Sequence, residues 1–177
     1  MIERTIIAGA GGQGIMLLGR VLAEAAIKEN KYVTWLPAYG AEVRGGIAHC
    51  MVVISDQEIG SPYIDQADTL IIMNGLALGK FANIIKNKGL LIVNSSLVSK
   101  DMDRNLTVLK YPFTDIAVKL GNIKVANTVA LGCYLAKNKI IDIKNVLKVI
   151  EEIAPKDKKE LVEINKQAVL SGVKLIK

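Results

Sequence analysis

The chain has 177 residues, of which 51% are hydrophobic and 23% are charged, as is typical of one globular domain rather than a disordered chain. Its net charge is +6, but most of the excess comes from residues 137–177, where lysines alternate with acidic residues, and aromatic residues make up 5% of the chain. This pattern argues against a nucleic-acid partner, which needs a basic stripe with stacking aromatics. We therefore expect a single domain over residues 1–177.

The single histidine and the two cysteines, 83 positions apart, argue against a metal site held by this chain alone, whether zinc or an iron–sulfur cluster. The amino-terminal segment has no signal-peptide pattern, and no apolar run approaches the roughly 18 residues of a membrane span. With its free cysteines, the chain is predicted to be cytoplasmic, with no membrane partner.

Short β-branched runs alternate with longer segments of helical periodicity. Strands are expected at residues 5–8, 32–35, 47–55, 69–73, 90–93 and 107–111. Helices are expected at residues 15–29, 76–87, 115–120, 127–137, 142–153 and 157–171. This order predicts an α/β fold, a three-layer Rossmann-like domain with a mostly parallel sheet and a helical C-terminal segment. Ligands or partners are expected at the carboxyl ends of the strands.

The glycine loop, Gly9–Gly14 (GAGGQG), follows the first strand and precedes the first helix. Such glycines bring bare backbone N–H groups to a helix amino terminus, where an anion is favoured. A dinucleotide site also needs an acidic residue, or an arginine for a 2′-phosphate, near the end of the second strand. The segment Trp35-Leu36-Pro37 has neither, so NAD binding is disfavoured. A purely structural turn between strand and helix is the alternative.

A second glycine-rich segment, Pro37–Gly46, carries Tyr39, Glu42 and Arg44 at the end of another strand. Arg44 can bind a carboxylate or a phosphate with its forked donors, or it can pair with Glu42 and shape the loop. Loops at this edge of a parallel sheet often carry function, and both interpretations stay open.

The remaining polar candidates have structural explanations. His49 lies inside a strand without an evident partner and is expected to be a satisfied core or edge histidine. Cys50 and Cys133 lie among apolar residues and are expected to be inert thiols. Asn127 and Thr128 are interpreted as a helix N-cap. The chain has no GxSxG motif, P-loop or thiamine-binding motif, so no residue is assigned as catalytic.

Several segments together resemble one family, the gamma subunit of 2-oxoacid:ferredoxin oxidoreductases. The segments are Gly9–Gly14, Pro37–Gly46, Ile54-Ser55 with Ile59–Pro62, and Asn127–Gly132. The form PAYGAEVRGG is most similar to the 2-oxoglutarate branch, and the pyruvate, 2-ketoisovalerate and indolepyruvate branches are the alternatives. One departure is the stretch Ile47-Ala48-His49, where smaller polar residues are expected.

The resemblance implies an enzyme that decarboxylates a 2-oxoacid on thiamine diphosphate, passes electrons through iron–sulfur clusters to ferredoxin, and forms an acyl-CoA. Alpha and beta subunits, often with a small ferredoxin-like delta subunit, would hold the thiamine and the clusters, and this chain would be a structural subunit without a cofactor of its own. The resemblance also places Gly11, Gly12, Gln13 and Gly14 near a CoA phosphate. It places Tyr39, Glu42 and Arg44 at a subunit contact or at the edge of the site. The alternative from a different class is a free-standing nucleotide-binding enzyme.

Overall fold

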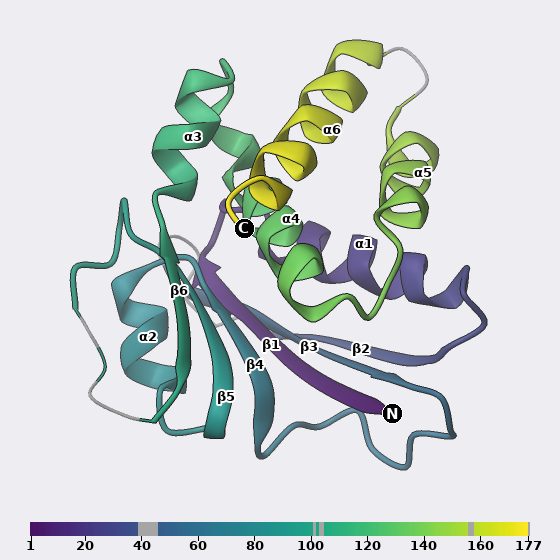
Figure 1. Cartoon of the computed structure of the whole chain (residues 1–177), viewed down its shortest axis with the longest axis vertical. Coiled ribbons are helices and arrows are strands. Elements are labelled where there is room, and N and C mark those ends of the chain that lie inside the picture. Colours follow the sequence, from purple (N-terminus) through teal and green to yellow (C-terminus); the bar gives the residue numbers. More distant parts are fainter. Residues whose placement is uncertain (39–45, 101, 103–104, 156–157, 177) are drawn as a thin grey trace.

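The fold is built on one six-stranded sheet with the strand order β2-β3-β1-β4-β5-β6. The computed structural model describes residues 1–38, 46–100, 102, 105–155 and 158–176 (Figure 1). The strands are β1 (Ile2–Ala10), β2 (Tyr32–Ala38), β3 (Ile47–Ser55), β4 (Ala67–Ile72), β5 (Ile85–Asn94) and β6 (Thr107–Tyr111).

Most of the sheet is parallel, as predicted. Strand β1 pairs in parallel with β4, β4 with β5 and β5 with β6, whereas β3 is antiparallel to both of its neighbours, β1 and β2. Because only β3 is reversed, the other five strands end at the same edge of the sheet. This edge, called the carboxyl edge below, also contains the beginning of β3, since Ala10 of β1 lies opposite Ile47.

Helices cover the two faces of the sheet unequally (Figure 1). The helices are α1 (Ile15–Ile27), α2 (Gly75–Phe81), α3 (Phe113–Lys119), α4 (Ala126–Asn138), α5 (Ile143–Ile153) and α6 (Lys159–Val173), with a 3₁₀ turn, η1 (Ile123–Val125). Ile7 of β1 lies in the core that α1 and α4 share with the other C-terminal helices, whereas its neighbours Ile6 and Ala8 pack with α2. Because β1 is buried on both faces, its sequence is a continuous apolar run, and the three-layer prediction is confirmed.

The C-terminal helices are held together by a close crossing of α4 and α6. A Cβ atom placed on Gly132 would lie 2.0 Å from the carbonyl oxygen of Val169 and 3.1 Å from the Cα atom of Gly172. The two backbones can approach this closely only because neither glycine has a side chain. Tyr134, also on α4, is fully buried.

One predicted helix has the wrong extent. The helix expected at residues 76–87 ends at Phe81, because Ile85 instead enters β5 beside Ala67 and is 3% exposed. Pairing with β4 therefore overrides the helical periodicity of this segment. Helix α6 begins at Lys159. None of the helices within the described residues is both long and apolar enough to cross a membrane.

Candidate functional site

The glycine loop is braced by its own side chain, Gln13. The Oε1 atom of Gln13 accepts a hydrogen bond from the backbone N–H of Ala10 at 2.7 Å, and its Nε2 atom donates to the carbonyl of Met73 at 3.3 Å. A Cβ atom on Gly9 would lie 2.6 Å from Oε1, so the first glycine of the motif makes room for this brace. The side chain of Gln13 thus holds the loop against Met73, which directly follows β4, while the loop backbone faces outward.

The outer part of the glycine loop presents backbone to solvent. Gly11 and Gly12 are exposed, and a Cβ atom on Gly12 would meet nothing within 4 Å. Gly12 and Gly14 have φ angles of +90° and +71°, in the region that favours glycine. Within the described residues, the N–H groups of Gly12, Ile15 and Met16 have no acceptor. Unpaired N–H groups at a helix amino terminus are the groups that bind anions.

Asn127 is a residue of this site whose role the sequence did not reveal. It lies in the first turn of α4, is 2% exposed, and donates from Nδ2 to the carbonyl of Gly14 at 2.9 Å. The N-cap interpretation of Asn127 and Thr128 is wrong, because η1 runs directly into α4 and Val125 precedes the helix. In the sequence, the one signal for Asn127 was that it belongs to a segment shared with the resembled family, Asn127–Gly132.

The second predicted group of site residues, Tyr39, Glu42 and Arg44, lies outside the described residues. The residues that flank this segment, Ala38 and Gly46, lie at the carboxyl edge. The carbonyl of Gly46 accepts a hydrogen bond from the N–H of Gly11 at 3.1 Å, and Ala38 lies opposite His49 in the sheet. One end of the segment is therefore bonded directly to the glycine loop.

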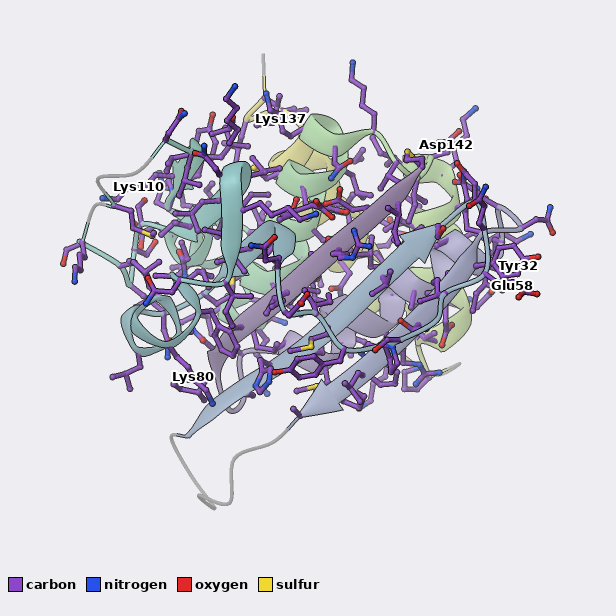
Figure 2. All side chains as sticks on the ribbon, turned by 90° about the horizontal axis from the view of Figure 1, so that it is seen from below. Tyr32, Glu58, Lys80, Lys110, Lys137 and Asp142 are labelled. Atoms are coloured by element: carbon purple, nitrogen blue, oxygen red, sulfur yellow. The ribbon has the colours of Figure 1, made fainter. Side chains whose placement is uncertain are left out.

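His49 is not the satisfied histidine that the sequence predicts. Its Nδ1 atom is buried and has no hydrogen-bond partner among the described residues, and its ring packs on Phe81 at a centroid distance of 4.7 Å. Burial, and to a lesser extent the charge of Lys80, lower the pKa of His49 below its usual 6.5. Figure 2 shows Lys80 and Tyr32 at opposite ends of the β2–β3 pair, with Lys80 at the carboxyl edge.

The two cysteines are buried and unpaired, as predicted. Burial raises the pKa of the Cys50 thiol to about 12, and it raises the pKa of the Cys133 thiol to about 12 as well. A thiol with such a pKa stays protonated at neutral pH and is a poor nucleophile and a poor metal ligand. Among the described residues, no three His, Cys, Asp or Glu side chains are grouped so that they could hold a metal ion.

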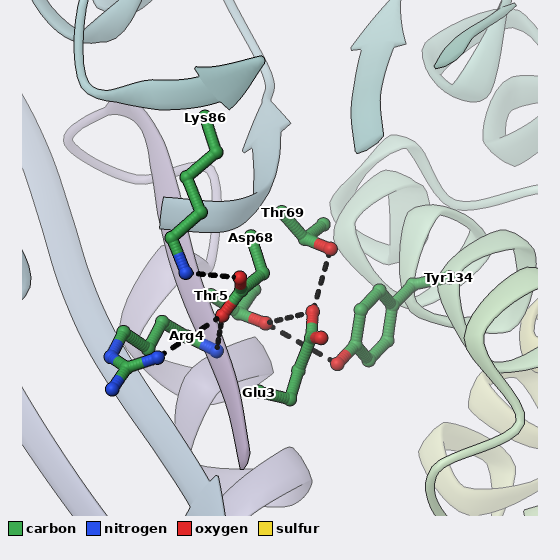
Figure 3. Close-up of polar contacts among 7 residues, drawn as sticks. All are labelled: Glu3, Arg4, Thr5, Asp68, Thr69, Lys86 and Tyr134. Atoms are coloured by element: carbon green, nitrogen blue, oxygen red, sulfur yellow. Dashed lines mark hydrogen bonds and ion pairs between the residues drawn. The ribbon is translucent and has the colours of Figure 1, made fainter. Parts of the chain in front are cut away.

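The opposite edge of the sheet carries a polar cluster of a different kind (Figure 3). Glu3 accepts a hydrogen bond from Thr69 at 2.7 Å, and Thr5 lies 3.3 Å from the hydroxyl of Tyr134. Burial raises the pKa of Glu3, and the bond from Thr69 opposes this effect. Because these side chains bond to one another, the cluster joins α4 to the sheet and is a structural brace.

Residues 4–175 match the profile of one family, pyruvate ferredoxin/flavodoxin oxidoreductase. The chain belongs to this family. The match confirms the resemblance drawn from the motifs, and it includes the glycine loop, the segment around Arg44 and the first turn of α4.

Relatives of this family show the same domain alone and within a longer chain. The 2-oxoglutarate synthase subunit KorC of Methanocaldococcus jannaschii is 36% identical over 158 residues, which cover 87% of this chain and 84% of KorC. The ketoisovalerate oxidoreductase subunit VorA of Methanothermobacter marburgensis is 38% identical over 133 residues, which cover 75% of this chain and only 28% of VorA.

The fold also agrees with a solved structure. The crystal structure of a keto/oxoacid ferredoxin oxidoreductase gamma subunit from Geobacter sulfurreducens matches with a TM-score of 0.86 and 31% identity, over 98% of each chain. A match over nearly the full length of both chains covers the sheet and the C-terminal helices together.

Proposed function

We propose that this chain acts as the gamma-type subunit of a 2-oxoacid:ferredoxin oxidoreductase, an enzyme that converts a 2-oxoacid and CoA to an acyl-CoA. The likeness to a gamma subunit over 98% of both chains is the observation that carries this proposal. The described residues offer no nucleophile with an activated pKa, so the chain is proposed to contribute binding and assembly rather than chemistry.

The contribution to binding is assigned to the glycine loop. Its exposed backbone at Gly11 and Gly12 suits a phosphate group of CoA, as do the N–H groups at the start of α1, which have no acceptor among the described residues. Gly14 belongs to the same turn, and the side chain of Gln13 stabilises this turn by its hydrogen bond to Ala10. The backbone of all four residues, Gly11 to Gly14, is therefore proposed to lie near the phosphate.

The cofactors of such an enzyme do not fit this chain. Iron–sulfur clusters need several thiolate ligands, and Cys50 and Cys133 are buried thiols whose pKa lies far above neutral. We assign thiamine diphosphate and the clusters to alpha, beta and delta partner subunits, with ferredoxin as the electron acceptor. Buried, reduced thiols also suit the cytoplasm, which is the compartment that we propose.

The contact with these partners is assigned to Tyr39, Glu42 and Arg44, which belong to the segment between Ala38 and Gly46. Support comes from the described flanks, since Gly46 bonds to Gly11. A partner bound at this segment would cover the glycine loop from one side and lower the local dielectric around a bound phosphate. Anion binding becomes stronger when water is excluded in this way.

The substrate proposed is 2-oxoglutarate, because the Pro37–Gly46 motif is most similar to that branch and KorC matches over most of its length. The pyruvate, 2-ketoisovalerate and indolepyruvate branches are the alternatives, and the match to VorA favours 2-ketoisovalerate among them. A free-standing nucleotide-binding enzyme is the second candidate function. The exposed glycine loop supports this candidate as well as the first.

Reconstitution tests these assignments. The purified chain is mixed with separately purified thiamine-binding and cluster-binding subunits, and CoA-dependent reduction of ferredoxin is followed with 2-oxoglutarate, 2-ketoisovalerate and pyruvate. We expect activity only when this chain is present, with the highest kcat/KM for 2-oxoglutarate. The isolated chain should show no absorbance at about 400 nm. Full activity without this chain, or nucleotide turnover by it alone, would contradict the proposal.

A further inference from the structure

A cavity of about 240 Å³ lies within the helical layer, between α1, α4, α5 and α6. Its walls are apolar and include Leu18 and Val21 of α1, Leu131 of α4 and Ile150 of α5, all of them buried. It is larger than an engineered protein cavity of about 150 Å³, lined by similar side chains, that stays dry and binds benzene. The space is therefore sufficient for a six-membered ring with a small substituent.

Among the described residues, the lining contains no charged side chain, and its polar members are Asn127, Thr128 and Asn165. A carboxylate or phosphate in this cavity would lose its hydration without gaining a countercharge, which is strongly unfavourable. The cavity is thus chemically distinct from the glycine loop, and it excludes both 2-oxoacids and the phosphates of CoA. An uncharged occupant is required.

One polar atom in the cavity has unused bonding capacity. The hydroxyl of Thr128 has a single proton and lies 2.8 Å from Oδ1 of Asn165 but 3.4 Å from Oδ1 of Asn127. It therefore donates mainly to Asn165 and makes only a long bond to Oδ1 of Asn127. Because an amide oxygen can accept two hydrogen bonds, Oδ1 of Asn127 can accept a second one. Since Asn127 is 2% exposed, this acceptor is out of reach of bulk water, and a buried acceptor gains most from a donor.

The opening of the cavity is apolar as well. Leu17 and Leu161 both line the cavity and are 44% and 38% exposed. Exposed leucines beside an apolar cavity allow an uncharged molecule to enter without passing a polar barrier. The opening lies on α1 one turn beyond Gly14, because Leu17 is three residues further along the chain.

We propose that this cavity binds a small, uncharged, ring-sized molecule that carries one hydrogen-bond donor, which is bonded to Oδ1 of Asn127. Because Nδ2 of the same side chain holds the carbonyl of Gly14, an occupant shifts the glycine loop through Asn127. The shift of the glycine loop is a consequence of binding in the cavity. Binding in the cavity itself does not depend on what the loop binds.

Phenol is the probe for this site, with toluene and benzoate as matched compounds of similar size. The full chain, labelled with ¹⁵N, is titrated at neutral pH, and the amide shifts of Leu17, Leu18 and Val21 are followed. We expect saturable shifts with phenol, binding of toluene that is weaker by up to about tenfold because it lacks the donor, and no binding of benzoate. A phenol-dependent shift of the Gly14 amide reports the link to the loop.

Filling the cavity is the second arm of the experiment. Ala154 lines it in an extended conformation (φ −72°, ψ 141°) that a larger residue also adopts, so Ala154→Phe should abolish phenol binding. Ala136→Phe places the same side chain near the carboxyl-terminal end of α4, outside the cavity lining, and is the control. If Ala154→Phe does not fold, Ala154→Leu replaces it.

Three results would overturn the assignment: no saturable shift with phenol, equal binding of benzoate, or unchanged binding in the filled variant. Equal affinities for phenol and toluene would remove Asn127 as the partner. A failure of CoA binding at the glycine loop would leave all of these outcomes unaffected, so the two proposals are tested separately.

Discussion

Glycine has opposite roles in the glycine loop and at the crossing of α4 and α6. In the loop, Gly12 has open space around it and a positive φ angle, so its backbone conformation requires glycine. At the crossing, Gly132 and Gly172 have ordinary helical conformations, but a Cβ atom on either would lie 2.0 Å from a backbone oxygen of the other helix. One region keeps its backbone accessible, and the other brings two backbones into contact.

The comparison shows how a glycine required by a site differs from a glycine required by packing. Substitution at the crossing should destabilise the fold, because backbone atoms cannot move aside separately from their helices. Substitution of Gly12 in the loop should change ligand binding with a smaller effect on stability, because a Cβ atom there meets no other atom within 4 Å. Substitutions at Gly132 and Gly12 test this division, whereas those at Arg44 and His49 test the proposed subunit contact and the buried imidazole.

Gly132→Ala should lower the free energy of unfolding by about 3 kcal/mol, since the new methyl group overlaps the carbonyl of Val169. Urea denaturation measures the change. Gly79→Ala in α2 is the control, because a Cβ atom there meets nothing within 4 Å, and it should stabilise the protein by up to about 1 kcal/mol. Equal stability of the two variants would show that the crossing can relax.

Arg44→Ala should weaken assembly with the partner subunits by about 2 kcal/mol, as expected of an arginine in an interface, and leave the stability of the isolated chain unchanged. Binding of the immobilised chain to the partner subunits measures the affinity. Arg20→Ala is the control, because Arg20 is an exposed residue of α1 that pairs with Glu24 one turn away. Native affinity after loss of Arg44 would reduce its role to shaping the loop.

Gly12→Val should raise the KM for CoA of the assembled enzyme by about tenfold, or about 1.4 kcal/mol, because a branched side chain is strained at a φ of +90°. Relief of this strain would change the backbone that presents the N–H groups to the phosphate. Assembly should stay normal. Gly60→Val, at an exposed position with open space around it, should leave the KM unchanged. A normal KM in both variants would make the glycine loop a structural turn only.

The smallest effect expected is a pH dependence of stability from His49. Burial holds the pKa of the folded protein below the unfolded value of 6.5, so the unfolded chain binds the proton more readily. Stability is then full above about pH 6.5 and falls as the pH decreases through the lowered pKa. His49→Gln should flatten the unfolding curve against pH in this range, and an unchanged slope would show that other groups cause it.

Much of the fold follows from the sequence because its signals are local. Alternating β-branched and helical segments are enough to predict the α/β class, and a GAGGQG motif between a strand and a helix is enough to place an exposed backbone turn. The sequence also predicts that the two cysteines are buried, because each has apolar neighbours in the sequence and lies with them in a buried strand or a buried helix. The helix that ends early at Phe81 marks the limit, because pairing of Ile85 with Ala67 is not a local property.

What only the tertiary structure decided depends on contacts between residues far apart in the chain. Asn127 meets Gly14 across 113 positions, and no local pattern distinguishes such a buried amide from a helix cap. Nδ1 of His49, which has no partner within the described part of the chain, depends in the same way on α2. The crossing at Gly132 depends on α6, and the cavity beside Leu131 depends on α1. The sequence by itself determined the elements and the glycine loop, whereas packing determined which polar groups are left without a partner, because hydrogen-bond satisfaction is a property of the whole fold.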